Sequence, residues 1–262
     1  MSSLWKFGPS GLGPIKTALD TLEEYNRLGL KTCEIAFTYS VYIKNKGDAE
    51  KIGKRAEELG IELRIHGPYW VNLNSEEPQK IENSKNLILR CLEVGTWLGA
   101  KIVVFHPGFY GKRSKEETYE KIKKGILEIE NERKKRGYTT EMAPETMGKI
   151  NVFGSTGEIR KLVEDTGCNF CIDFAHILAR DKDYRFEEVL KLFEKFEKLY
   201  LHFSGIVYGE KGEKHHRRTE EDEWKKFLKA LPKNKEISIV NESPTPVEDA
   251  IEGLSLSRIN GI

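Results

Sequence analysis

The sequence predicts an α/β protein whose single domain, residues 1–262, is a (β/α)8 barrel, also called a TIM barrel. Short apolar runs alternate with longer amphipathic runs eight times along the chain, and such barrels typically span about 250 residues. No linker rich in Gly, Ser or Pro divides the chain. A doubly wound sheet would also alternate strands and helices, but eight regular units without a second domain favour the barrel.

The expected strands are runs rich in Val, Ile, Phe and Tyr. Such runs are typical of parallel strands that are buried on both faces. In chain order, the expected strands cover residues 5–8, 32–37, 62–67, 101–106, 139–145, 170–174, 199–204 and 236–242.

The runs between the strands repeat apolar residues at helical spacing, and several of them end in Gly. The stretch "STGE" reads as a helix start with Ser155 or Thr156 as its cap. In chain order, the expected helices cover residues 15–30, 49–60, 84–100, 119–137, 155–167, 185–198, 220–231 and 246–254.

One connection is long. It runs from Ser204 to Thr219 after the seventh strand, and it contains "EKHHRR". We expect a loop here, and loops of more than about 12–15 residues in a compact domain are usually functional or disordered.

The composition is that of a soluble globular protein, with 38% hydrophobic and 32% charged residues. Lys and Glu dominate the charged residues, a bias that is typical of thermophile proteins. Because the net charge is only +1, a polyanion would have to be met by a local basic patch.

The sequence favours a cytoplasmic protein without membrane contact. The start shows no signal peptide, and no apolar run approaches the roughly 18 residues of a membrane span. The four cysteines fit a reduced intracellular protein. We also expect a monomer.

Ligand-type residues follow six consecutive predicted strands, from the third to the eighth. In a barrel, the carboxyl ends of the strands form the active face. One residue of this kind alone would suggest a hydrogen-bonded side chain or a helix cap, but so many carboxylates crowded together require compensating cations. The residues are His66, His106, Glu145, Asp173, His176, His202 and Glu242.

Mixed His, Asp and Glu ligands suit zinc or another borderline divalent ion such as Mn2+. With Glu213 and either His215 or His216 added, the ligands exceed the need of one ion. We therefore expect two or three metals, which is an arrangement suited to phosphoester hydrolysis. Isomerisation of a carbonyl substrate is the competing chemistry, and it needs fewer metals and imidazoles.

Seven motifs in order, "HGPYWVNL", "HPG", "PETMG", "CIDFAH", "LHFSG", "EKHH" and "NESP", resemble the endonuclease IV family over residues 1 to about 254. The resemblance implies a zinc-dependent DNA repair endonuclease on a (β/α)8 barrel. Its substrate would be double-stranded DNA with abasic (apurinic/apyrimidinic) sites, cut at the phosphodiester 5′ to the site to leave a 3′-hydroxyl.

The resemblance also implies roles for individual residues. His66, His106 and Glu145 would hold one zinc, and Glu145 would bridge to a second zinc held by Asp173, His202 and Glu242. Glu145 and Glu242 would be catalytic as well. The third zinc would be held by His176, Glu213 and His215.

The chain departs from the family pattern in ways that mostly spare the ligands. The family's "ENTAG", "D-T-x-H" and "HxND" appear here as "PETMG", "DFAH" and "HFSG". The family's Asp-x-His reads here as Glu213-Lys214-His215, in which the carboxylate is one methylene longer.

Contacts with DNA are predicted in two places. Tyr69 and Trp70 follow His66, where aromatic rings could wedge into the duplex or pack under the rim. Arg217 and Arg218 belong to one of three basic clusters, "YIKNK", "GKRSK" and "KHHRR", which could contact phosphates or be a solvated surface.

Two other functions remain open. One is a xylose-isomerase-like sugar isomerase or epimerase with one or two divalent ions. The other is a protein that holds abasic DNA without cutting it, which the substituted "HFSG" and Glu213 would favour.

Overall fold

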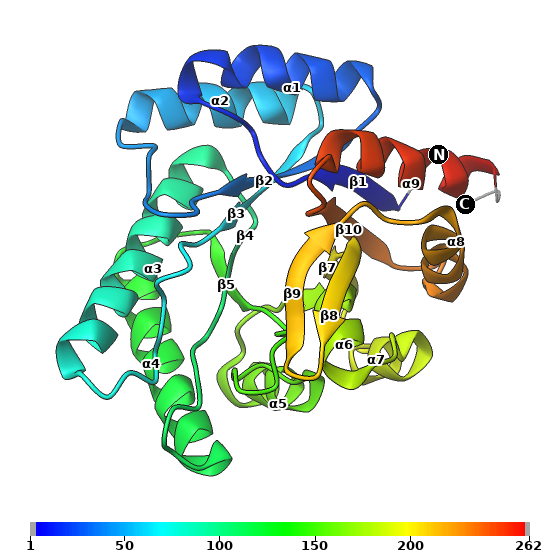
Figure 1. The fold of residues 1–262 in the computed structure, drawn as a ribbon. Coiled ribbons are helices and arrows are strands. Elements are labelled where there is room, and N and C mark those ends of the chain that lie inside the picture. Colours follow the sequence, from blue (N-terminus) through cyan, green and yellow to red (C-terminus); the bar gives the residue numbers. More distant parts are fainter. Residues whose placement is uncertain (1–3, 260–262) are drawn as a thin grey trace.

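In a computed structural model of the chain, which describes residues 4–259, eight parallel strands form a barrel with helices around it (Figure 1). The predicted fold class is confirmed, while the outer limits of the predicted domain, 1 and 262, lie outside the described residues. The barrel strands are β1 (Trp5–Pro9), β2 (Thr32–Ala36), β3 (Glu62–His66), β4 (Ile102–Phe105), β5 (Glu141–Pro144), β6 (Ile172–Asp173), β7 (Lys198–His202) and β10 (Glu236–Asn241).

The barrel consists of two four-stranded sheets, ordered β1-β10-β7-β6 and β2-β3-β4-β5 in the described chain. Two short seams join them. At the seam between β1 and β2, the backbone N–H of Gly11 donates to the carbonyl of Glu34 at 2.7 Å. At the seam between β5 and β6, the N–H of Cys171 donates to the carbonyl of Pro144 at 3.1 Å. The first seam also has a bond from the N–H of Lys31 to the carbonyl of Phe7, and the second has bonds from Asn169 to Met142 and from Thr146 to Cys171, so backbone hydrogen bonds close the barrel at both seams.

Helices follow the strands as the sequence predicts, with α6 as an addition. Ser155 caps α5 and Ser114 caps α4, each in a capping box with the glutamate three residues later. The helical elements are the 3-10 turn η1 (Ile15–Thr17), α1 (Ala18–Arg27), α2 (Lys46–Glu58), α3 (Pro78–Leu98), α4 (Lys115–Lys135), α5 (Thr156–Thr166), α6 (Phe174–Asp181), α7 (Phe186–Leu192), α8 (Glu221–Ala230) and α9 (Pro246–Ile259). In the part of the chain that the structure describes, no helix is both long enough and apolar enough to cross a membrane.

The predicted long loop after the seventh strand is wrong. That stretch is an antiparallel hairpin formed by β8 (Gly205–Gly209) and β9 (Gly212–Arg217), which lies beside the barrel in Figure 1. Its second strand is polar, so it lacks the apolar run that marks a buried strand. Similarly, α6 was not predicted because it begins directly after the two-residue strand β6, within one continuous apolar run.

The barrel strands alternate between an inner and an outer face, as β3 illustrates. Leu63 and Ile65 belong to the large apolar core under the helices. Glu62, Arg64 and His66 alternate with them and therefore point into the barrel. The inner face of this one strand thus carries a charged or imidazole side chain at each level, from the amino to the carboxyl end.

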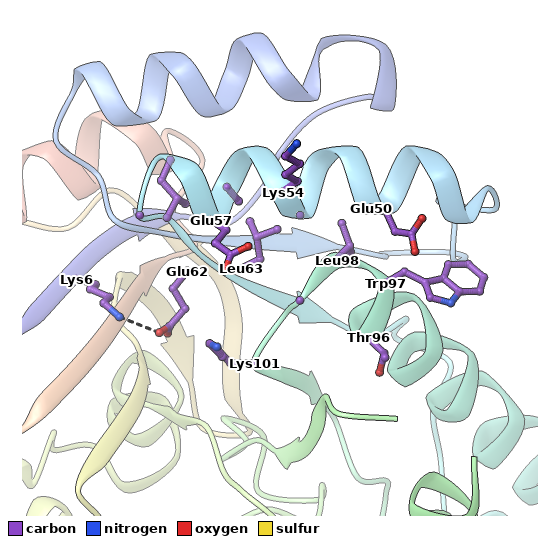
Figure 2. A pocket seen from close by; sticks show the side chains of 15 residues that line it. Lys6, Glu50, Lys54, Glu57, Glu62, Leu63, Thr96, Trp97, Leu98 and Lys101 are labelled. Atoms are coloured by element: carbon purple, nitrogen blue, oxygen red, sulfur yellow. Dashed lines mark hydrogen bonds and ion pairs between the residues drawn. The ribbon is translucent and has the colours of Figure 1, made fainter. Parts of the chain in front are cut away.

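An ion-pair cluster closes the amino end of the barrel. Glu62 contacts Lys6 at 3.0 Å and also Lys198, and both lysines lie 2.8 Å from Glu236. Figure 2 shows the Lys6–Glu62 pair at the edge of a recess of about 590 Å3, whose lining also includes Trp97. The lysines and glutamates neutralise one another, which fits a structural role at this end.

Candidate metal centre

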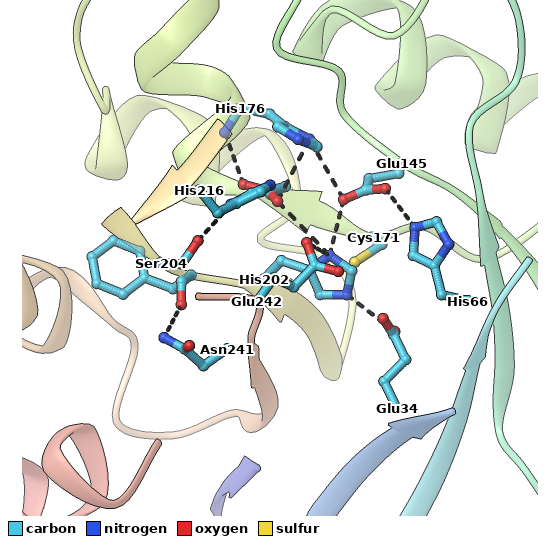
Figure 3. A network of polar contacts seen from close by, with 12 residues as sticks. Glu34, His66, Glu145, Cys171, His176, His202, Ser204, His216, Asn241 and Glu242 are labelled. Carbon is cyan, nitrogen blue, oxygen red and sulfur yellow. Dashed lines mark hydrogen bonds and ion pairs between the residues drawn. The ribbon is translucent and has the colours of Figure 1, made fainter. Parts of the chain in front are cut away.

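The predicted ligand residues except His215 lie together at the carboxyl end of the barrel (Figure 3). Those from the barrel end a strand, follow one directly or stand in the first turn of α6, and Glu213 comes from the hairpin strand β9. Most are almost fully buried, including Glu145, Asp173 and His202. The residues that the structure brings together are His66, His106, Glu145, Asp173, His176, His202, Glu213, His216 and Glu242.

Glu145 is the centre of the cluster. Its Oε2 lies 3.1 Å from Nε2 of His106 and 3.3 Å from Nε2 of His66. Its Oε1 lies 2.9 Å from Nδ1 of His202. One carboxylate therefore faces two groups of imidazoles from opposite sides, which is the arrangement of a bridging ligand.

Hydrogen bonds fix the tautomers of two of these rings. Nδ1–H of His66 donates to the carbonyl of Gly67 at 2.8 Å, and Nδ1–H of His176 donates to the carbonyl of Thr146 at 2.9 Å. A carbonyl oxygen can only accept, so Nε2 of each neutral ring carries a lone pair. In both rings this nitrogen faces a carboxylate oxygen, so either a proton on the ring or a metal ion lies between the two atoms.

Ligand atoms in the described chain gather into groups within 4.8 Å. His66, His106 and Glu145 form one group, and Glu145, Asp173, His202 and Glu242 form another; both sets coincide with the predicted first and second sites. The other groups are Asp173 with His176 and His216, and Glu145 with Cys171 and His202.

The third group differs from the predicted one in its hairpin histidine. Val207 pairs with His215 and Tyr208 pairs with Glu213, so Lys214 is an extra residue in a β-bulge. The bulge places Glu213 and His216 on the same face, whereas in a regular strand Glu213 would share its face with His215. His216 therefore stands beside His176, and His215 is exposed on the opposite face.

Two carboxylate oxygens in the cluster lack partners. Oδ2 of Asp173 and Oε2 of Glu213 are buried without a hydrogen bond among the described residues. The other oxygen of Asp173 accepts from the backbone N–H of His176 at 2.8 Å and caps α6. Buried acceptors without donors are costly unless a cation satisfies them, so these residues fit a divalent metal with nitrogen and oxygen ligands.

Charge in the cluster is unbalanced. Its carboxylates are those of Glu34, Glu145, Asp173, Glu213 and Glu242, whereas Arg64 is the only buried arginine or lysine among residues 4–259. With neutral imidazoles, as metal ligation requires, four negative charges remain once Arg64 is counted, and two divalent cations would neutralise them.

The imidazoles and carboxylates shift each other's pKa. Burial opposes charging of His66, but contact with Glu145 outweighs it and raises its pKa to about 9. Burial likewise opposes charging of His176, and Asp173 and Glu213 raise its pKa to about 9. Although burial disfavours a charged carboxylate, His202 and the other imidazoles hold the pKa of Glu145 well below its usual range. The groups thus stabilise each other's charged forms.

Exposed aromatic side chains border the cluster. Trp70 and Tyr69 are 66% and 55% exposed, so they do not pack under the rim. Trp70 donates from Nε1 to the carbonyl of Tyr39 at 3.2 Å, and Tyr39 is itself 73% exposed. The Tyr69 ring lies 5.5 Å from that of His106, between the cluster and the surface.

The two predicted phosphate-binding arginines have other partners. Arg217 makes two hydrogen bonds of 2.9 Å to the carboxylate of Glu223 in α8. Arg218 donates to Glu252 in α9 at 2.8 Å. These ion pairs attach the end of the hairpin to the helices, and the structure does not bring either guanidinium to the metal cluster.

The structure adds residues that sequence reasoning missed. Glu34 accepts a hydrogen bond from Nε2 of His202 at 3.0 Å, and Ser204 lies 2.7 Å from Nδ1 of His216. A signal for Glu34 was present, because a charged residue in the middle of the apolar run "TCEIAF" has to be paired when buried. Ser204 carried no such signal.

A pocket of about 300 Å3 opens above the cluster. Its lining is partly polar, with His66, Glu213 and His216, and partly apolar, with Phe109 and Met147. A ligand in this pocket would contact both the metal ligands and an apolar wall.

Residues 22–259 match the sequence pattern of a protein family described as xylose isomerase-like TIM barrel. The chain belongs to the xylose isomerase-like TIM barrel family. An uncharacterized protein of Methanocaldococcus jannaschii is 35% identical over 94% of each chain. A protein of Oceanobacillus iheyensis described as "Probable endonuclease 4" is 30% identical, in an alignment that covers 54% of each chain.

Solved structures share the fold of this family member. Endonuclease IV from Thermus thermophilus superposes with a TM-score of 0.73 at 23% identity and 97% coverage of both chains. D-psicose 3-epimerase from Clostridium cellulolyticum superposes with a TM-score of 0.68 at 15% identity and the same coverage. The predicted resemblance to endonuclease IV is confirmed, although the endonuclease 4 relative aligns over only about half its length.

Proposed function

We propose that this protein is a metal-dependent DNA repair endonuclease that hydrolyses the phosphodiester 5′ to an abasic site in double-stranded DNA. The observation that carries the proposal is the position of Glu145, which lies between a group containing His66 and His106 and a group containing His202. A carboxylate shared by two such groups suits a cluster of two or three metals, whereas a single metal would need neither the bridge nor both groups.

The donor sets suit zinc, with manganese as the alternative. We assign His66, His106 and Glu145 to one ion, and Glu145 with Asp173, His202 and Glu242 to the second. We assign Asp173, His176 and His216 to the third, with the Glu213 carboxylate 3.5 Å from His176. Bound zinc ions would supply Lewis-acid charge to the phosphoryl oxygens and lower the pKa of water.

The side chains around the cluster would bind and orient the substrate. Glu145 and Glu242 lie on the floor of the site, where a carboxylate can accept a proton from an attacking water. The exposed rings of Tyr39, Tyr69 and Trp70 could stack on bases at the edge of the lesion. The pocket of about 300 Å3 is small for a nucleic-acid site, so only the damaged unit would enter while the duplex stayed outside.

The proposal includes a single domain, a monomer and a cytoplasmic location. The described chain has four cysteines, which are all free and buried, and this fits a reducing compartment.

The test is a nicking assay with protein that has been stripped by a chelator and reloaded with zinc or manganese. The substrate is an end-labelled duplex with one tetrahydrofuran abasic analogue, and the control is the same duplex without it. We expect a single cut 5′ to the analogue that leaves a 3′-end extendable by a polymerase. Glu145→Gln should abolish the cut. Lesion-specific binding without product at any metal loading would instead identify a non-cleaving binder.

A sugar epimerase is the second candidate. The superposition with D-psicose 3-epimerase and the small pocket favour it. One metal per chain by elemental analysis, together with turnover of a ketose and no DNA product, would establish it in place of the nuclease.

A further inference from the structure

A buried ion pair lies inside the barrel directly below the metal cluster. Glu34 of β2 and Arg64 of β3 are register partners, and neither is exposed to solvent. Oε2 of Glu34 lies 3.1 Å from Nη2 of Arg64. None of the roles assigned above uses this pair.

Arg64 is held in place from several strands. Its Nη1 donates to the carbonyl of Ser238 at 3.2 Å and to that of Leu201 at 3.4 Å. Its Nη2 lies 3.4 Å from Sγ of Cys171, and the guanidinium lies over the ring of Tyr200 at 5.6 Å. Because these contacts come from β7, β10 and the residue just before β6, the guanidinium has little freedom to move, and it fixes the Glu34 carboxylate.

Glu34 in turn fixes His202. The Oε2 atom of Glu34 that contacts Arg64 also accepts a hydrogen bond from Nε2 of His202 at 3.0 Å, as Figure 3 shows. Both ring nitrogens face carboxylates, but only Nδ1 lies within a group of metal ligands, so a metal there would leave the proton of the neutral ring on Nε2, donated to Glu34. Nδ1 is aimed at Glu145 at 2.9 Å and at Glu242 at 3.3 Å, within the second ligand group.

The pair is poorly explained by stability alone. Burying two charges costs several kcal/mol, and replacing such a pair with apolar side chains is often neutral or stabilising. Oε1 of Glu34 and Nε of Arg64 also lack hydrogen-bond partners within the described chain. By contrast, His66 and His176 are oriented by uncharged backbone carbonyls. A carbonyl would therefore suffice to orient His202 as well, and the negative charge of Glu34 must have a further effect on that ring.

We propose that Glu34, clamped by Arg64, is a positioning residue for the second metal site, to which His202 is assigned. It holds His202 in the tautomer that presents Nδ1 and increases the electron-donating strength of the ring. The inference rests on the metal cluster of the proposed function but not on its DNA substrate.

The test is Glu34→Gln, with Glu62→Gln as the matched control. A glutamine amide can donate to Nε2 of His202, which would leave the proton on Nδ1 and block ligation. Glu62 is also a carboxylate in a buried ion pair, but it lies at the amino end of the barrel. We expect Glu34→Gln to bind one zinc about 10- to 100-fold more weakly in chelator competition, and to change the visible spectrum of the Co2+-substituted protein. Glu62→Gln should change neither.

A second measurement needs no variant. In two-bond 1H–15N spectra of the zinc-loaded wild type, the signals assigned to His202 should show the proton on Nε2 and the metal on Nδ1. The reverse pattern would overturn the proposal, even if Glu34→Gln failed to fold.

The outcomes separate this proposal from the function. If the wild type binds zinc and Glu34→Gln binds it with equal affinity and the same Co2+ spectrum, the positioning role is wrong while the nuclease proposal stands. If the wild type binds no zinc, cobalt or manganese, both are wrong. If metal binding depends on Glu34 but abasic DNA is not cut, only the function is wrong.

Discussion

His215 and His216 are adjacent in sequence but have opposite surroundings. His216 lies in the pocket lining with Ser204 at its Nδ1, whereas the His215 side chain is exposed. The two residues therefore provide a matched pair for testing the third metal group.

We expect His216→Ala to lose one metal, because it removes one of the three ligands in the group of Asp173, His176 and His216. Affinity at that site should fall by at least about 10- to 100-fold, the loss typical even of partners outside the coordination sphere. Elemental analysis after dialysis against a chelator measures the loss. His215→Ala is the control and should keep the wild-type metal content; the opposite result would restore the assignment made from sequence.

Trp70→Ala should weaken binding to an abasic duplex by about 1–3 kcal/mol, the usual value of one stacked base. Trp70 is 66% exposed, so its removal should leave both folding and zinc content unchanged. Fluorescence anisotropy with labelled duplex gives the affinity. Trp97→Ala, at the opposite end of the barrel, serves as the control. Equal affinities for both variants would remove Trp70 from the DNA-binding surface.

The ligands at strand ends could be predicted from sequence because a parallel barrel brings all carboxyl ends to one face. The positions of His66 and Glu145 follow as soon as β3 and β5 are recognised as strands, because His66 ends β3 and Glu145 directly follows β5. His216 could not be predicted, because its orientation depends on the bulge at Lys214, and no local pattern marks the bulge. Glu34 was missed because it points inward from the middle of a strand, and its partner His202 is 168 residues away.

At the scale of elements, the hairpin β8–β9 and the loop after β5 interlock through two glycines. The N–H of Glu213 donates to the carbonyl of Gly148 at 3.3 Å. Gly212 has a φ of 96°, and a Cβ at this position would lie 2.1 Å from the carbonyl oxygen of Gly148. This contact determines where the hairpin delivers Glu213 and His216.

Gly212→Ala should therefore push the hairpin away from the loop and remove the third metal, while the barrel stays folded. Gly111→Ala is the control, because Gly111 also has a positive φ of 62° but a Cβ there would meet nothing within 4 Å. It isolates the backbone strain, about 1 kcal/mol, from the steric clash. We expect metal analysis to show the loss in Gly212→Ala alone. Loss in both variants would trace the effect to strain.

The prediction of the elements succeeded where the pattern was apolar and failed where it was polar. The strands β3 and β4 stand out because their outward residues pack under helices. The hairpin strand "GEKHHR" packs no apolar face of its own, and its position depends on contacts with a distant loop.

At the scale of the whole molecule, the carboxylates at the two ends of the barrel have different kinds of partner. The carboxyl end sets most of its carboxylates against imidazoles, and the amino end pairs its glutamates with Lys6 and Lys198. Although burial opposes ionisation, Lys198 and Lys6 lower the pKa of Glu236 to about 2. The same lysines lower the pKa of Glu62.

These lowered values predict acid sensitivity. A carboxyl whose pKa is lower in the folded state contributes stability above its unfolded pKa, about 4.5, and loses that contribution as the pH falls through the folded value. At pH 7, Glu62→Gln should lower the free energy of unfolding by about 3 kcal/mol, and the half-exposed Glu236→Gln by less than about 1 kcal/mol. Urea unfolding of the chelator-treated proteins should show both differences shrinking as the pH falls below 4.5, that of Glu236→Gln between pH 4.5 and 2. Differences independent of pH would show that the ion pairs are not their source.

Because the ligand residues come from both sheets, bound metals would link the two halves of the barrel across the seams. His66, His106 and Glu145 belong to the half-barrel β2-β3-β4-β5, whereas Asp173, His202 and Glu242 belong to the other half. The group around Glu145 and the Glu34–His202 contact therefore both span the boundary between the halves. Metal loading should make the halves open as one cooperative unit. The seam amides of Gly11 and Cys171 should then gain protection from hydrogen exchange on loading, out of proportion to amides within either sheet.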